Sequence, residues 1–134
     1  MTKTLDFTLP GQLHVAALVS PAGREYRFML FEKDNGSHAV ARFYDPHRAS
    51  EKKSISVYDD SHEHGLWFGT AMRNVWHNVN KNGWKLDFNE DLAKNKKCAP
   101  LINLLFTMSS ATEEPEYEDL EAIGKEFLRK ITKN

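Results

Sequence analysis

The stretch REYRFMLFEKDNGSHAVARFY, residues 24–44, decides the fold. Arg24–Lys33 alternates imperfectly between two faces, and its aromatic residues suit the pleated surface of a strand. Asp34–Gly36 follows, and because these residues tolerate positive φ, they are typical of a hairpin turn. Ser37–Tyr44 then supplies the return strand. The stretch therefore predicts an antiparallel β-hairpin.

More strands are expected on both sides of this hairpin. Gln12–Ser20 reads as a strand that ends at a Pro-Ala-Gly turn, and Ser54–Tyr58 reads as a short strand. Trp84–Phe88 alternates and indicates a fifth strand or an extended arm. The first half of the chain thus predicts an antiparallel meander with one face on a core.

Helical patterns dominate the second half. A first helix is expected after Tyr58, with N-cap candidates at Asp59, Asp60 and Ser61. Its apolar residues recur at helical spacing: Leu66, Phe68, Met72, Val75, Trp76 and Val79. Gly65 and Gly69 either weaken its start or allow close packing against the sheet. Pro100–Met108 favours a buried helix, although its period also allows a core strand.

The last helix has the clearest pattern in the chain. Its apolar stripe comprises Tyr117, Leu120, Ile123, Phe127, Leu128 and Ile131. Acidic residues crowd its start and basic residues its end, which complements the helix dipole. Strands first and helices later predict an α+β fold, with a meander of about four to five strands against two to three helices. We expect residues 1–134 to form one domain.

Composition narrows the possible functions. The 134 residues are 40% hydrophobic with a formal net charge of −1, which excludes a wholly disordered chain and a protein that binds duplex DNA by bulk charge. Cys98 is the only cysteine, so it has no disulfide partner within the chain, and we expect a packed thiol. Neither a signal peptide nor a membrane span is evident. These features favour a cytoplasmic protein without a membrane partner.

The acidic segment TEEPEYEDLE, residues 112–121, favours a non-enzymatic module that binds or inhibits another protein. It has the charge to face a basic partner, with Glu113, Glu114, Glu116 and Glu118 as the predicted contacts. The alternative is that these charges only cap a helix. No specific catalytic motif is present, so we predict neither catalytic residues nor a cofactor. A homodimer is also among the partners that the sequence allows.

Single-stranded DNA or RNA is the second partner that the sequence favours. Basic side chains track phosphates and exposed rings stack on bases. The predicted contacts are Arg27, Phe31, Arg42, Tyr44, Arg48, Lys52 and Lys53. The order of four strands and a helix over Gln12–Gly83 is similar to one unit of the PUR-like and Whirly-like single-strand-binding domains. That resemblance implies a curved antiparallel sheet backed by a helix, often in an oligomer. We expect the opposite face of the sheet to be open to a ligand.

Chemistry around His62 and His64 is the third hypothesis. In an extended segment these two histidines share a side, and Asp60 and His77 would complete a set of nitrogen and oxygen ligands that zinc accepts. A histidine–aspartate pair also suits proton transfer. The spacing matches no strong metal signature, because a second spaced pair is absent. The sequence leaves the choice among the three hypotheses open.

Overall fold

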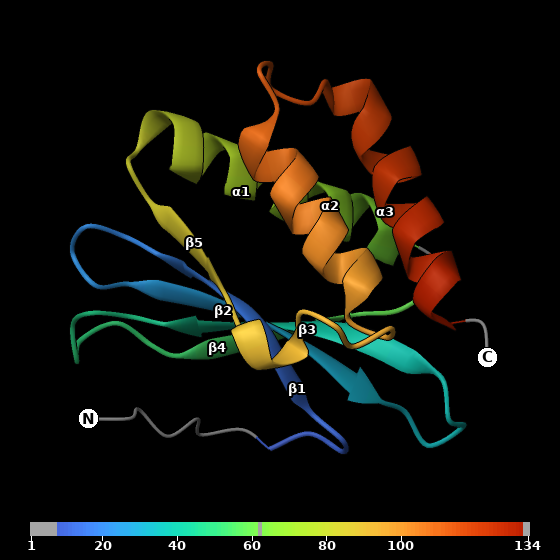
Figure 1. Ribbon diagram of the computed structural model, residues 1–134. Coiled ribbons are helices and arrows are strands. Elements are labelled where there is room, and N and C mark those ends of the chain that lie inside the picture. Colours follow the sequence, from blue (N-terminus) through green and yellow to red (C-terminus); the bar gives the residue numbers. More distant parts are fainter. Residues whose placement is uncertain (1–7, 62, 133–134) are drawn as a thin grey trace.

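The computed structural model describes residues 8–61 and 63–132. In chain order the elements are β1 (Leu13–Val19), β2 (Glu25–Glu32), β3 (His38–Asp45), β4 (Ser54–Tyr58), α1 (His64–Lys81), β5 (Lys85–Phe88), η1 (Glu90–Leu92, a short 3-10 helix), α2 (Ala99–Ser110) and α3 (Tyr117–Thr132). They confirm the predicted α+β class (Figure 1). Across these two ranges, no helix combines the length and apolar character needed to cross a bilayer.

The strands form one antiparallel sheet in the order β4-β3-β2-β1-β5. The first four follow one another as the predicted meander, and β5 returns beside β1 after α1. The β2–β3 hairpin turns at Gly36, whose φ is 84°. Just beside it, the amide of Lys33 donates to the carbonyl oxygen of Ser37 at 2.7 Å. A positive φ favours glycine, so the predicted turn is confirmed in its place and its cause.

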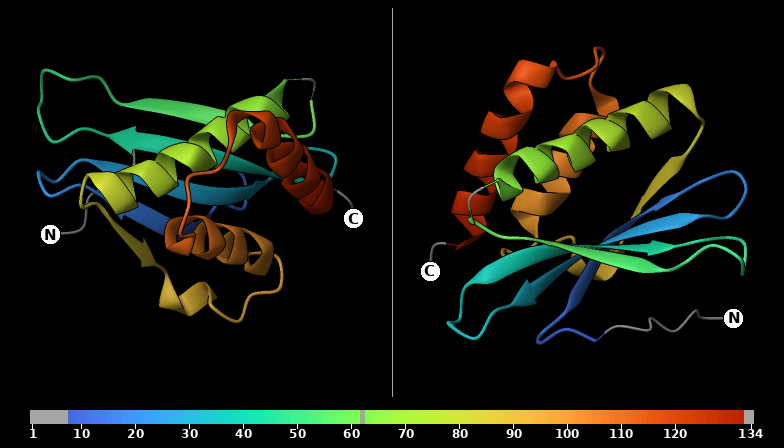
Figure 2. Two further views of the ribbon diagram at one scale, coloured as in Figure 1. Left: turned by 90° about the horizontal axis from the view of Figure 1, so that it is seen from above. Right: turned by 180° about the vertical axis from the view of Figure 1, so that it is seen from behind.

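All three α-helices cover the same face of the sheet (Figures 1 and 2). The main core lies between the two layers, and Cys98 is packed within it as predicted. The largest fully buried side chains that it contains are Phe28, Phe68, Leu18, Leu30, Met72, Leu101, Leu105, Leu128 and Val15. Strand residues enter this core at alternate positions, because successive side chains of a strand point to opposite faces; in β1 a register shift between His14 and Ala16 places both Val15 and Ala16 in it.

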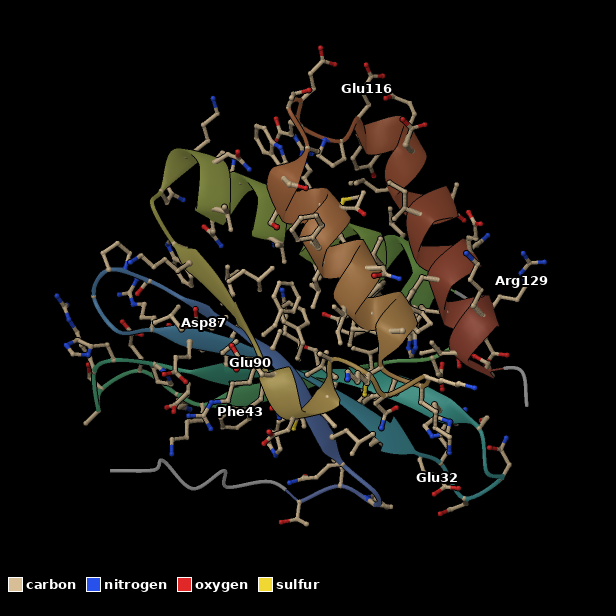
Figure 3. The ribbon with its side chains drawn as sticks, viewed as in Figure 1. Glu32, Phe43, Asp87, Glu90, Glu116 and Arg129 are labelled. Carbon is tan, nitrogen blue, oxygen red and sulfur yellow. The ribbon has the colours of Figure 1, made fainter. Side chains whose placement is uncertain are left out.

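The opposite face of the sheet is buried at its centre. Met29, Ala39, Ala41 and Phe43 are fully buried there and Phe31 nearly so, with Leu9 and Ile55 packed against them. Figure 3 shows Phe43 on the side of the sheet away from the helices. The expectation that this face is open is therefore wrong for its central part. β2 and β3 carry apolar side chains on both of their faces, and both faces are buried.

Helices α1 and α3 cross with their backbones in contact. A Cβ atom added to Gly69 would lie closer than 3.0 Å to the carbonyl oxygen of Leu120, and one added to Gly124 would lie as close to the carbonyl oxygen of Gly65. At such a crossing the Cα–H groups of glycine point at carbonyl oxygens, a weakly favourable contact. The predicted close packing of Gly65 and Gly69 therefore exists, but its partner is α3 and not the sheet.

The start of α1 differs from the expected capping. The helix begins at His64, and the preceding Glu63 has a φ of 76° and makes no side-chain cap. Asp59 closes the turn before the helix instead, because its carboxylate accepts hydrogen bonds from the amide of Ser61 at 2.8 Å and from Lys33 Nζ at 3.2 Å. Burial raises the pKa of Asp59, but these hydrogen bonds outweigh it and hold that pKa well below its usual range.

Substitution of the crossing glycines tests this contact. We expect Gly69→Ala and Gly124→Ala to lower the free energy of unfolding by about 2 kcal/mol or more, because overpacking outweighs the gain of about 1 kcal/mol in helix propensity. Gly65→Ala is the comparison and should cost less, since its new Cβ would overlap the Lys125 side chain but lie 3.1 Å from the amide nitrogen of Lys125 and 3.3 Å from the carbonyl oxygen of Glu121, which is tight without overlap. Urea denaturation measures all three. Equal effects at the three positions would contradict a backbone contact.

Candidate protein-binding surface

The acidic segment 112–121 joins α2 to α3 and includes the first turn of α3. It carries six carboxylates and no basic side chain. Tyr117 opens the helix, and the amide of Asp119 donates to the carbonyl oxygen of Glu116 at 3.0 Å. The segment lies at the end of the molecule farthest from the sheet, where Glu116 projects outward (Figure 3). The negative charge is therefore concentrated at one end.

One side of α1 holds this connection in place. Trp76 Nε1 donates to the carbonyl oxygen of Ala111 at 2.9 Å, and Asn80 Nδ2 donates to that of Ser109 at 3.2 Å. Residues three and four positions apart share a side of a helix, so Arg73 and His77 lie with these two donors. The end of α2 is thus tied to α1 by two side-chain-to-backbone hydrogen bonds.

Glu114 is part of this attachment. Its Oε1 accepts from Arg73 Nε at 3.0 Å and lies 3.7 Å from His77 Nδ1. The hydrogen bond from Arg73 holds the pKa of the Glu114 carboxyl below its ordinary value. Of the four glutamates predicted to bind a partner, Glu114 is therefore the one that α1 engages. The position of α1 beside the segment could not be foreseen from residue spacing.

Four of the other five carboxylates lie close in sequence to an exposed ring, and the fifth, Glu121, pairs with Lys125. Glu113, Glu116, Glu118 and Asp119 are exposed, and the side chain of Tyr117 is 63% exposed. We call these five residues the acidic crest. Sequence reasoning placed Tyr117 in the buried stripe of α3, which is wrong, because the first buried position is Leu120. Its place at the first helical position, among acidic residues, was the available sign that the stripe starts later.

The residues predicted to bind single-stranded nucleic acid do not share one surface. In the β2–β3 register Arg27 pairs with Phe43 and Phe28 pairs with Arg42. Paired residues point to the same face of a sheet, so Arg42 and Tyr44 face the helices, whereas Arg27 and Phe31 face away from them. The prediction that Arg27 shares a face with Phe31, and Arg42 with Tyr44, is correct within each strand, but spacing along a strand could not show that the two pairs lie on different faces of the sheet.

Several of the same residues already have partners within the chain. Arg27 Nε donates to Glu25 at 2.8 Å, and the hydroxyl of Tyr44 donates to Glu51 Oε2 at 2.7 Å. Phe31 is only 8% exposed, so it offers no ring for stacking. Arg48, Lys52 and Lys53 are exposed in the loop between β3 and β4. Only this loop therefore keeps the basic, accessible character that the nucleic-acid hypothesis needs.

Arg42 has a different environment. Its guanidinium lies 4.9 Å from the centre of the Tyr26 ring, and it forms no ion pair with any residue of 8–61 or 63–132. It borders a hollow of about 470 Å³ between β4 and α1, together with Ser56 and the exposed Trp67. Sequence reasoning missed Trp67, although it lies off the helical stripe formed by Phe68, Met72 and Val75, all three of which are buried.

The histidines of the metal hypothesis are only partly described. His62 lies outside the described residues. His64 Nδ1 is 2.9 Å from Asp59 Oδ1, and the His64 ring lies 5.2 Å from that of Trp67. His77 is farther along α1, by about 20 Å at 1.5 Å per residue. Within the described ranges, no group of three His, Cys, Asp or Glu side chains has the geometry to hold a metal ion.

Comparison with known proteins adds no assignment. No protein-family model, no curated protein and no solved structure significantly matches the chain. The resemblance to PUR-like and Whirly-like domains stays a prediction. The function proposed below rests on the geometry and charge of the acidic crest.

Truncation of Trp76 tests how strongly α1 holds the connection. Trp76→Ala should lower the free energy of unfolding by about 3–5 kcal/mol, because a buried indole is lost. Trp76→Phe keeps a ring but loses the hydrogen bond to Ala111, so its cost should be nearer 1–2 kcal/mol. Chemical denaturation followed by circular dichroism gives both values. A loss below about 0.5 kcal/mol for Trp76→Ala would show that the ring contributes little.

The attachment of Glu114 should depend on pH. The folded-state pKa of this carboxyl lies below its ordinary value of 4.5, so its contact with Arg73 stabilises the fold above that value and is lost as the pH falls through the lowered pKa. The difference in unfolding free energy between the wild type and Glu114→Gln should therefore shrink from about pH 6 to about pH 3. Urea denaturation across this range provides the measurement, and a constant difference would contradict it.

Proposed function

We propose that the protein is a non-enzymatic binding module that docks its acidic crest on a basic surface of a second protein, as an inhibitor or interaction partner. The observation that supports this most is the exposed Tyr117 ring within a group of exposed carboxylates. Aromatic residues, tyrosine and tryptophan above all, dominate the binding energy of protein interfaces. An exposed ring among side chains that are all negatively charged suits recognition of a basic surface on another protein.

The charges and the ring would contribute differently to binding. The carboxylates steer a basic partner toward the crest and suppress partners of like charge, an effect that is strongest at low salt. The ring of Tyr117 supplies contact area at a small cost in conformational entropy, because it has few rotatable bonds. Association should therefore slow as salt rises, while dissociation depends mainly on the ring.

The attachment to α1 favours the same role. Ordering a mobile loop on binding costs free energy, and a surface fixed beforehand avoids part of that cost. Arg73, Trp76 and Asn80 already hold the connection between α2 and α3. Because Glu114 is used in this attachment, the backbone that carries the neighbouring carboxylates is anchored to α1.

The basic surface that fits the crest best is one that normally holds phosphate groups. Such surfaces carry clustered Lys and Arg side chains, whose favourable partners are closely spaced negative charges. Closely spaced carboxylates on a rigid turn resemble that pattern of charge. We therefore expect the partner to be a protein that acts on or binds a nucleic acid or another polyanion.

Capture from a lysate of the native host, followed by binding measurements with the purified partner, tests the proposal. The triple variant Glu113→Lys, Glu116→Lys, Glu118→Lys should weaken binding by about 100-fold or more, because it replaces attraction with repulsion. Tyr117→Ala should weaken it by about tenfold or more and mainly raise the dissociation rate. Surface plasmon resonance at two salt concentrations separates these effects.

The matched control reverses the same number of charges away from the crest. Glu32, Asp87 and Glu90 are exposed and lie on the side of the sheet, far from Glu116 (Figure 3). The variant Glu32→Lys, Asp87→Lys, Glu90→Lys should change affinity by less than about threefold. Equal losses in the two triple variants would refute a specific role for the crest. So would capture of single-stranded oligonucleotides alone, if it depended on Arg48 and Lys52.

A further inference from the structure

The segment around β4 is basic at one end and acidic at the other, so two antiparallel copies of it would have complementary charges. Residues 52–60 read KKSISVYDD, so a basic pair precedes the strand and an acidic pair follows it. Between them lies Ser54–Tyr58, the whole of β4. Two copies of such a segment placed antiparallel bring the basic end of each to the acidic end of the other. Lys52 and Asp60 are both exposed.

The outer edge of β4 is unpaired in the part of the chain that the structure describes. β4 is the outermost strand of the sheet and pairs only with β3. Seen from above the helices, it forms the border of the sheet, with no other ribbon beyond it (Figure 2, left). A free edge presents a row of backbone donors and acceptors that can pair with another strand. β4 therefore has the backbone groups for one more neighbour.

Exposed apolar side chains lie next to this edge on both faces of the sheet. Val57 is 40% exposed, and Ile55 lies on the same face, two positions away. On the helix side, Trp67 of α1 is 51% exposed and borders a hollow together with Ser56 and Tyr58. Large exposed apolar side chains beside a free edge lose water contact when a further strand is added.

We propose that two copies of the chain pair antiparallel through β4 and form a homodimer with one continuous sheet. The twofold axis would pass beside Ser56, which then faces Ser56 of the other copy. In this register Ile55 lies opposite Val57, and Ser54 lies opposite Tyr58. The apolar pair falls on one face, where cross-strand contacts stabilise a sheet. Lys52 of each copy comes beside Asp60 of the other.

The charges also disfavour the other ways of pairing. A parallel arrangement would set lysines beside lysines and aspartates beside aspartates, and like charges opposite each other destabilise a sheet. A slip by one residue would move Val57 and Ile55 out of contact, because it turns every side chain to the other face. The same patch used twice is the usual form of a twofold interface. One register is thus preferred.

Dimerisation through β4 and partner binding through the acidic crest would use different surfaces, so neither depends on the other. The acidic crest is on the α2–α3 side of the molecule, whereas β4 is the far strand of the sheet (Figure 1). Pairing through β4 does not use Tyr117 or the carboxylates around it. The dimer would therefore present two crests.

Analytical ultracentrifugation of the full chain tests the dimer. The wild type should show a monomer–dimer equilibrium between about 1 and 500 µM. Val57→Lys should raise the dissociation constant by about tenfold or more, because it removes an apolar contact and adds two like charges to the interface. Phe106→Lys is the control: Phe106 is larger than Val57 and more exposed, 61% against 40%, but it lies on α2, and its change should have no effect.

A charge exchange then fixes the register. Lys52→Asp gives one copy an acidic side chain at both position 52 and position 60, and Asp60→Lys gives the other a basic side chain at both positions. Each variant alone should dimerise less well than the wild type, whereas an equimolar mixture should form a mixed dimer at least as tight. A chain that stays monomeric to about 500 µM overturns the proposal. So does a dimer unaffected by Val57→Lys, or a mixture that shows no recovery.

Discussion

Burial of the β2–β3 hairpin on both of its faces is the constraint on which the rest of the molecule depends. Phe28 and Leu30 enter the core under the helices, while Met29 and Phe43 form a second cluster on the opposite face. A pair of strands covered on both sides has little freedom to shift, because a slip by one residue exchanges its two apolar sets. The hairpin thereby fixes the platform on which α1 lies.

α1 connects the sheet to the far end of the molecule. Its inner side packs on the sheet through Phe68, Met72 and Val75. Another side, with Arg73, Trp76 and Asn80, holds the connection between α2 and α3. Since one rigid helix makes both sets of contacts, the acidic crest has a fixed position relative to the sheet. Rigid scaffolds of this kind commonly present binding residues on their connecting segments.

Local chemistry was sufficient to predict some of the elements from sequence, while the start of α1 was wrong and residues 100–108 were left open between helix and strand. The turn at Gly36, the five residues of β4 and the charge-ordered α3 each follow from neighbouring residues, and the structure has all three. The prediction of an open sheet face was wrong because burial of that face depends on residues far apart in the chain. Alternation assigns side chains to two sets, but it does not reveal what covers each set. The predicted nucleic-acid surface included both Arg27 and Arg42. The alternation within each strand was correct, but the two arginines lie on opposite faces of the sheet.

The candidate site was predicted in part for the same reason. Its acidic character is a property of ten consecutive residues, so the sequence contains it. The use of Glu114 by Arg73 joins positions far apart in the chain, and no local pattern indicates it. The exposure of Tyr117 depended on where the buried stripe of α3 begins, which packing against α1 decides.

The crossing of α1 and α3 has an evolutionary consequence. Surface positions such as those of the crest can change as partners change, but Gly69 and Gly124 have no room for any side chain. A lineage that keeps this crossing must therefore keep both glycines, even after the rest of its sequence has diverged. A glycine in α1 at the position of Gly69, together with one in α3 at the position of Gly124, is thus the pattern by which remote relatives of this fold can be recognised.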